Sequence, residues 1–139
     1  MQTTRELSIS LVPYSPLARG LVTSTLDVSI LAEDDFRRTL PRYQKENISN
    51  NNKLVKEFTT FAQTKGCTPS HLALAWVLAQ GDHIIPIPGT KKRKYLEENI
   101  GAIEVNLSDI DLVAIDGLIK QYPVIGERYS EASMKMVNR

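Results

Sequence analysis

Two short apolar segments have the pattern of β-strands, and they limit the folds open to this chain. Residues 7–12 alternate apolar and polar side chains and stop at Pro13, whereas residues 83–88 form a β-branched run with Pro86 and Pro88. Helical patterns lie between them, and strands separated by helices pair in parallel. Two parallel strands alone leave sheet edges and helix faces uncovered. The sequence therefore predicts an α/β architecture that is incomplete within these 139 residues.

Apolar spacing and capping residues predict two helices between the strands. Residues 54–62 place apolar side chains on one face, and Gly66 suits the C-terminal cap of that helix. Thr68 followed by Pro69 predicts the start of a second, mostly apolar helix that ends at Gly81. Because this second helix is apolar on most of its circumference, we expect it to be buried.

Two further helices are predicted after the second strand. One covers residues 92–101, and the other begins at Ser108, which has capping-box spacing with Asp111. The apolar stripe expected on the last helix consists of Ile110, Val113, Ala114 and Leu118. Residues 20–49 show poor periodicity, which is typical of a functional lid or of a segment that hides a short helix. We expect residues 124–139 to be a poorly ordered tail.

Composition argues against several classes of protein. The 17 Lys and Arg side chains are balanced by 16 Asp and Glu, which argues against a nucleic-acid partner. A single cysteine, Cys67, excludes an internal disulfide, and with no base or second cysteine evident we interpret it as inert. No apolar run reaches the roughly 20 residues that span a bilayer, and no leader is evident. We therefore expect a cytoplasmic protein with no membrane partner and no metal.

Four cations follow the second predicted strand, where a helix begins. Residues 91–94 read Lys-Lys-Arg-Lys, directly after Gly89 and Thr90. Ligands of α/β proteins bind outside the carboxyl ends of the strands, and the helix dipole disfavours cations at this end by roughly 0.3–1 kcal/mol each. A bound phosphate would offset that cost. The alternative is a solvated charged face without a ligand.

Three motifs, in order, resemble the aldo-keto reductase family. They lie at residues 14–20, 65–76 and 87–99, and the resemblance covers roughly residues 7–106. It implies a (β/α)₈ TIM barrel that uses NADPH to reduce aldehydes and ketones. Since the match begins near the family's seventh strand, we expect residues 1–139 to be a partial domain, the C-terminal portion of such a barrel.

The resemblance also implies which residues hold the cofactor, NADP(H). The matched residues are Tyr14, Ser15, Pro16, Leu17, Ala18, Arg19, Gly89, Thr90, Lys91, Tyr95, Glu98 and Asn99. Tyr14 matches the residue that stacks on the nicotinamide ring, and residues 15–19 match the turn around the pyrophosphate. Residues 89–91 match the holders of the adenosine 2′-phosphate, with the charge on Lys91.

The adenine contacts are implied for one face of the helix that follows. Tyr95, Glu98 and Asn99 stand at i, i+3 and i+4, so they share a helix face. Arg42 in the long loop is a weaker candidate for the cofactor, and we interpret His71 as structural.

The family's catalytic Asp, Tyr, Lys and His belong to the first half of the barrel, so we expect no catalytic residue here and do not assign that role to Tyr14. The chain is interpreted as a truncated, C-terminal fragment that supplies cofactor contacts, and a carbonyl substrate is expected only if the N-terminal half completes the barrel. One alternative is a non-catalytic remnant that folds or functions only with a partner chain. A weaker one is a helix-turn-helix around residues 66–69, whose second helix lacks Lys and Arg.

Overall fold

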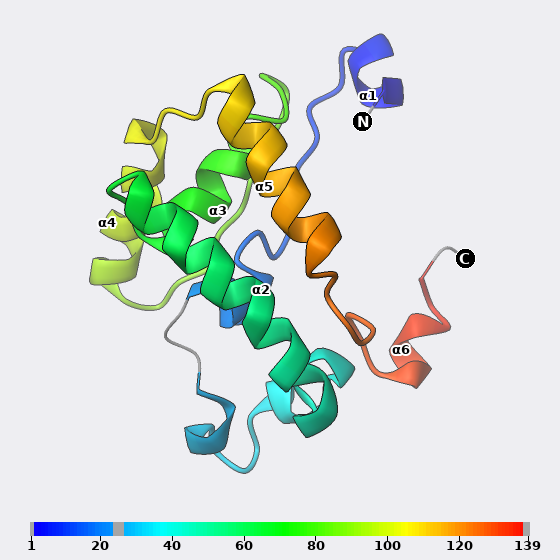
Figure 1. Ribbon diagram of the computed structural model, residues 1–139. Coiled ribbons are helices and arrows are strands. Elements are labelled where there is room, and N and C mark those ends of the chain that lie inside the picture. Colours follow the sequence, from blue (N-terminus) through cyan, green and yellow to red (C-terminus); the bar gives the residue numbers. More distant parts are fainter. Residues whose placement is uncertain (1, 24–26, 138–139) are drawn as a thin grey trace.

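Helices carry the part of the chain that the computed structural model describes, residues 2–23 and 27–137 (Figure 1). The α-helices are α1 (Gln2–Glu6), α2 (Lys45–Thr64), α3 (Pro69–Leu78), α4 (Arg93–Gly101), α5 (Asp109–Gln121) and α6 (Glu131–Met134). Short 3₁₀ helices cover Ala18–Thr23, Val28–Ile30, Phe36–Thr39, Pro41–Tyr43 and Ala102–Glu104. Helix α2 packs against α3 and α5, and α4 packs against α3. None of the helices in these two ranges combines the length and apolar character that crossing a bilayer requires.

The junction between α2 and α3 follows the predicted capping chemistry. Gly66 adopts a φ of +65°, and the Cys67 amide donates to the Ala62 carbonyl at 3.1 Å, which ends α2. The Thr68 hydroxyl accepts from the His71 amide at 3.1 Å and begins α3. These boundaries are confirmed, although α2 starts at Lys45, well before its apolar face begins.

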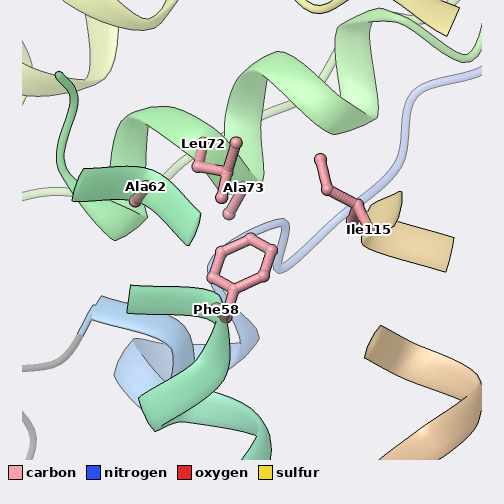
Figure 2. Packing of buried hydrophobic residues seen from close by; sticks show 5 residues of the cluster. All are labelled: Phe58, Ala62, Leu72, Ala73 and Ile115. Carbon is pink, nitrogen blue, oxygen red and sulfur yellow. The ribbon is translucent and has the colours of Figure 1, made fainter. Parts of the chain in front are cut away.

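The main core lies where α2, α3 and α5 meet (Figure 2). Its buried members are Phe58, Ala62, Leu72, Ala73 and Ile115. Full burial of a large apolar side chain contributes about 1.5–3 kcal/mol, so Phe58, Leu72 and Ile115 each stabilise the fold by that order. Helix α3 supplies buried residues from most of its length, as its composition predicts. A helix in the core cannot read a DNA groove, which argues against the helix-turn-helix alternative.

A capping box begins α5, as the sequence predicts. The Ser108 amide donates to the Asp111 carboxylate at 2.8 Å, and the Asp111 amide donates to the Ser108 hydroxyl at 3.3 Å. The Lys65 ammonium lies 2.6 Å from the same carboxylate and ties the end of α2 to the start of α5. The hydrogen bond from Lys65, followed by those from Ser108, lowers the pKa of Asp111 to about 2.

The prediction of which face of α5 is buried is wrong. Ile110 and Val113 are 81% and 72% exposed, whereas Ile115 is fully buried. Helix α5 turns the Ile115 face towards α2 and α3, and it is tied to α3 on one side by the Trp76 indole N–H, which donates to Asp116 at 3.2 Å. Three residues of the expected stripe, Ile110, Val113 and Ala114, are therefore exposed, and Leu118 is half-buried.

In the described residues neither predicted strand forms, but the two segments lie side by side and run parallel, as predicted. Only two isolated bridges join the segments, Leu11 with Ile84 and Tyr14 with Ile87, and both are parallel. The Leu11 amide donates to the His83 carbonyl at 2.8 Å. Prolines at positions 13, 86 and 88 lack the amide N–H that a ladder needs, and no other segment pairs with either outer edge in the described part. The segments therefore lie side by side without a continuous ladder.

The first residues of the first predicted strand form the turn that ends helix α1. The Leu7 and Ile9 amides donate to the Thr3 and Thr4 carbonyls at 3.1 and 2.8 Å, and Ser8 between them has a φ of +53°. This is a helix C-terminus, which competes with extended structure for the same backbone groups. Arg5 then donates to the Gln80 carbonyl at 2.6 Å and holds α1 against the turn that follows α3.

The two segments with weak sequence signals are both structured where they are described. Residues 20–49 contain 3₁₀ helices and the first turn of α2; residues 24–26 lie outside the described residues. Residues 124–137 contain α6 and are fixed to α2 by Asn51, whose amide accepts from the Ile125 N–H at 2.7 Å and donates to the Ile125 carbonyl at 2.9 Å. The end of the expected poorly ordered tail, residues 138–139, lies outside the described residues.

Candidate functional site

A cleft with a volume of about 770 Å³ lies between the turn after the first bridge segment and the loop before α4. The matched residues that line it are Ser15, Pro16, Leu17, Arg19, Gly89, Thr90, Lys91, Tyr95, Glu98 and Asn99. They come from segments about seventy residues apart in sequence, which the parallel bridge between Tyr14 and Ile87 brings side by side. The structure thus gathers most of the sequence-predicted site into one place.

The turn that forms one wall of the cleft has an unusual backbone. Ser15, Ala18 and Arg19 have φ values of +54°, +46° and +54°, in a region that costs side-chain-bearing residues on the order of 1 kcal/mol each. Such strain persists where the surroundings hold it. Here the buried Tyr43 hydroxyl donates to the Ala18 carbonyl, and Arg37 donates to the Arg19 carbonyl at 3.4 Å. The turn is therefore held in this conformation by contacts from the 3₁₀ segments.

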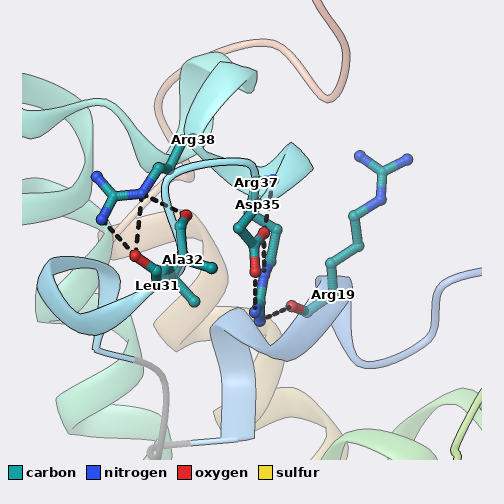
Figure 3. Close-up of polar contacts among 6 residues, drawn as sticks. All are labelled: Arg19, Leu31, Ala32, Asp35, Arg37 and Arg38. Atoms are coloured by element: carbon teal, nitrogen blue, oxygen red, sulfur yellow. Dashed lines mark hydrogen bonds and ion pairs between the residues drawn. The ribbon is translucent and has the colours of Figure 1, made fainter.

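Arg37 is itself fixed by a carboxylate two residues earlier (Figure 3). Its Nε and Nη2 donate to the two oxygens of Asp35 at 2.9 and 2.7 Å, and this contact lowers the pKa of Asp35 to about 2. Arg37 lines the cleft and was missed by sequence reasoning. In Figure 3 the Arg19 side chain points away from the Asp35–Arg37 pair, so its guanidinium is not neutralised there.

The opposite wall of the cleft is formed by the loop before α4 and by the first turns of that helix. The lysine matched to the phosphate site, Lys91, lies in this loop. The Thr90 hydroxyl accepts from the Lys92 amide at 3.1 Å, which shapes the turn into the helix. Lys91 is exposed, and within residues 2–23 and 27–137 no carboxylate lies within ion-pair distance of its ammonium. Lys92, which belongs to the predicted basic run but not to the matched cofactor residues, also lines the cleft, with its ammonium 5.8 Å from the Tyr95 ring centre.

Glu98, the acidic residue that lines the cleft, is held by the N-cap residue of α3. The Thr68 hydroxyl, while capping α3, donates to the Glu98 carboxylate at 3.1 Å. Tyr95, Glu98 and Asn99 all line the cleft, as their shared helix face predicts. An aromatic ring beside a carboxylate and an amide offers stacking and hydrogen bonding to a planar nitrogenous ring.

The remaining two matched residues line a smaller pocket that adjoins the cleft. Tyr14 and Ala18 face a cavity of about 310 Å³, and Ser15 and Arg19 contribute to both spaces. The other residues lining it are Arg42, Tyr43, Arg128 and Tyr129. Arg42, the weaker candidate, therefore lies in the smaller pocket rather than in the cleft.

The C-terminal segment reaches Tyr14 from the far end of the chain. The hydroxyl oxygens of Tyr14 and Tyr129 lie 2.5 Å apart. This hydrogen bond raises the pKa of the Tyr129 phenol, and together with Arg128 it lowers the pKa of the Tyr14 phenol. Sequence reasoning missed Arg128 and Tyr129, because a contact between residues 115 positions apart leaves no local pattern.

The other titratable residues considered from the sequence lie outside both cavities. Burial raises the pKa of the Cys67 thiol, which lowers its thiolate fraction and agrees with the interpretation of this residue as inert. His71 lies in the first turn of α3, where its Nε2 is buried against Gly101. In the described ranges, no three His, Cys, Asp or Glu side chains are grouped to hold a metal ion.

The sequence model described as "Aldo/keto reductase family" matches residues 1–120. The chain belongs to the aldo/keto reductase family. Among its relatives, "Aldo-keto reductase yakc [NADP(+)]" of Schizosaccharomyces pombe is 48% identical over 130 residues, which are 93% of this chain and 38% of the relative. "Aldo-keto reductase str7" of Strobilurus tenacellus is 36% identical over 139 residues, which are 99% of this chain and 41% of the relative. The chain thus spans about two-fifths of the length of these two aldo-keto reductases.

Solved aldo-keto reductase structures resemble this fold over most of the chain. The glycerol dehydrogenase AKR11B4 from Gluconobacter oxydans gives a TM-score of 0.74 at 23% identity, covering 89% of this chain and 38% of that protein. A thermostable aldo-keto reductase, Tm1743, gives 0.53 at 25% identity, covering 84% of this chain and 32% of that protein. The helices and bridge segments are therefore arranged as in part of an aldo-keto reductase, even though no strand forms in the described residues.

Proposed function

We propose that this chain forms the NADP(H)-binding part of an aldo-keto reductase that reduces aldehydes or ketones. The observation that carries the proposal is the cleft, where the residues 15–19 turn faces the start of α4 across a space of about 770 Å³. The relative from Schizosaccharomyces pombe, whose name specifies NADP(+), supports the choice of cofactor.

Charge supports the phosphorylated cofactor over the unphosphorylated one. Lys91 stands beside the free amides at the start of α4, where a helix dipole favours an anion. The adenosine 2′-phosphate supplies such an anion and would neutralise an ammonium that has no ion pair in the described residues. Residues 15–19 would then surround the pyrophosphate, Tyr95, Glu98 and Asn99 would contact the adenine, and Tyr14 would stack on the nicotinamide ring.

The test is a titration of the whole chain with NADPH and with NADH, followed by cofactor fluorescence. We expect Lys91→Ala to weaken NADPH binding at least about tenfold, as expected for a lost charge-assisted contact, and to change NADH binding less than about twofold. Lys94→Ala is the matched control, because Lys94 lies in the same basic run but does not line the cleft. Absence of saturable NADPH binding, or an equal loss for both cofactors, would refute the proposal.

We further propose that the chain corresponds to the C-terminal portion of a (β/α)₈ barrel and acts with the rest of that barrel, in the same polypeptide or in a partner chain. The exposed apolar side chains in and before the bridge segments support this idea, since Leu7, Ile9, Ile85 and Ile87 are 51–63% exposed. Neighbouring strands would cover such side chains and pair the open edges. The proton donor for carbonyl reduction would come from that part, and catalysis by this chain alone would contradict the proposal.

A further inference from the structure

Three guanidinium groups line the smaller pocket, and no carboxylate lines it with them. They belong to Arg19, Arg42 and Arg128, and none of the other residues that line the pocket is acidic. In the part of the chain that the structure describes, none of the three forms an ion pair. Like charges gathered in one cavity repel each other, so a ligand that brings negative charge would be stabilised there.

Backbone carbonyls and aromatic rings, not acids, hold these arginines. Arg42 donates to the Gly126 carbonyl at 3.1 Å, and Arg19 donates to the Arg128 carbonyl at 3.3 Å. The Arg19 guanidinium also lies 5.2 Å from the Phe36 ring centre and 5.1 Å from that of Tyr129. Each guanidinium carries several N–H donors, and these contacts use few of them. Oriented donors thus remain for a ligand.

The pocket lies at the Tyr14 end of the site, away from Lys91. If the nicotinamide ring stacks on Tyr14, the arginines surround the reacting end of the cofactor. The oxidised nicotinamide ring carries a positive charge and the reduced ring is neutral, so three cations there disfavour the oxidised cofactor unless an anion lies beside it. The ring itself therefore does not account for the arginines.

We propose that this pocket binds the acidic group of the substrate, so that the substrates are carbonyl compounds that also carry a carboxylate, such as oxo acids and carboxylated aldehydes. The inference rests on the proposed function. A carboxylate suits the planar, forked donors of arginine, which bind its two oxygens together. Arg128 is the principal specificity residue, because its guanidinium donates to no backbone carbonyl in the described part and lies beside the Tyr14 hydroxyl.

The cofactor's pyrophosphate is also an anion that arginines bind, so the experiment must distinguish its binding from that of a substrate carboxylate. Arg19 lines both cavities, so its replacement would not distinguish the two sources. Arg128 lines the smaller pocket alone. A variant at this position therefore tests the substrate carboxylate with least effect on the pyrophosphate turn.

The experiment is calorimetric titration of the whole chain, at low salt, with para-formylbenzoate and with its uncharged methyl ester. NADPH is titrated in parallel. We expect the acid to bind at least about tenfold more tightly than the ester, and Arg128→Gln to remove that preference while NADPH affinity changes less than about twofold. Arg93→Gln is the matched control, since Arg93 is exposed on α4 and lines neither cavity.

The outcomes separate this inference from the proposed function. Equal binding of acid and ester overturns the carboxylate site, whatever NADPH does. A loss of NADPH affinity in Arg128→Gln as large as the loss for the acid also overturns it, because the pocket then belongs to the cofactor. Binding of the acid with the expected Arg128 dependence but no NADPH binding would retain the anion site and reject the proposed function.

Discussion

Asn51 is the buried residue of α2 that binds the C-terminal segment, and its replacement tests that part of the structure. Its side chain is 1% exposed in the middle of α2. The amide nitrogen donates to the Arg42 carbonyl at 3.0 Å and to the Ile125 carbonyl at 2.9 Å, and the amide oxygen accepts from the Ile125 N–H at 2.7 Å. Asn51→Ala removes these hydrogen bonds and leaves their backbone partners unsatisfied.

The magnitude follows from those contacts. A net hydrogen bond contributes about 0.5–1.5 kcal/mol, and a buried group left without a partner costs about 1–3 kcal/mol. We therefore expect Asn51→Ala to lower the free energy of unfolding by about 2–4 kcal/mol. For a chain of this size that corresponds to a fall in Tm of about 8–16 °C. Asn52→Ala, at the exposed neighbouring position, is expected to change the free energy by less than about 0.5 kcal/mol.

Thermal unfolding followed by circular dichroism gives the Tm of both variants. Limited trypsin digestion shows directly whether the C-terminal segment has separated from α2. Release of residues 125–129 from α2 exposes the bond after Arg128, so Asn51→Ala should be cut there faster than Asn52→Ala. If the two variants unfold at the same temperature and are cut at the same rate, the proposed anchoring of the C-terminal segment is refuted.

Two further predictions concern the core and acid stability. Leu72→Ala should cost about 2–5 kcal/mol because Leu72 is fully buried, whereas Leu96→Ala at a half-exposed position should cost less than about 1 kcal/mol; urea unfolding compares them, and equal costs would contradict the described core. The lowered pKa of Asp111 stabilises the fold above its ordinary value of 3.8, and this contribution is lost as the pH falls towards about 2. Asp111→Asn should therefore have a lower Tm than the parent above pH 3.8, and the difference should shrink towards pH 2; a difference constant with pH would remove the assigned role of Lys65.

Local chemistry explains why the helix boundaries could be predicted and the strands could not. The cap of α3 at Thr68 and the capping box at Ser108 depend on neighbours within a few residues, so sequence spacing was sufficient. A strand depends on partners elsewhere, and here only one edge of each segment is paired. On α5, apolar periodicity alone did not decide which face is buried, because the packing of α2 and α3 selects Ile115.

Some residues of the candidate site could likewise be predicted from local sequence motifs, and others could not. Residues of the cleft carry recognisable motifs, and the structure brings them together. Arg37 stands in a charged run that resembles an ordinary solvated surface, and its role depends on Asp35 holding it against the turn. Asn51 and Arg42 anchor the segment that brings Arg128 and Tyr129 to the smaller pocket, and that buried asparagine sits within a polar triplet. Tertiary contacts of this kind have no signature in the neighbouring sequence.

The single tryptophan of the chain, Trp76, joins α3 to α5 through its hydrogen bond to Asp116. Its fluorescence therefore reports on the contact between these two helices. Because the indole is partly shielded between these helices, separation of α5 from α3 would expose the ring to water and shift its emission to longer wavelength. The phenols of Tyr14 and Tyr129 lie at a different place and absorb differently once ionised. Trp76 emission can therefore follow the helical core without a label, whereas phenolate absorbance sums the five tyrosines and reports the arginine-lined pocket by comparison with a Tyr129→Phe variant.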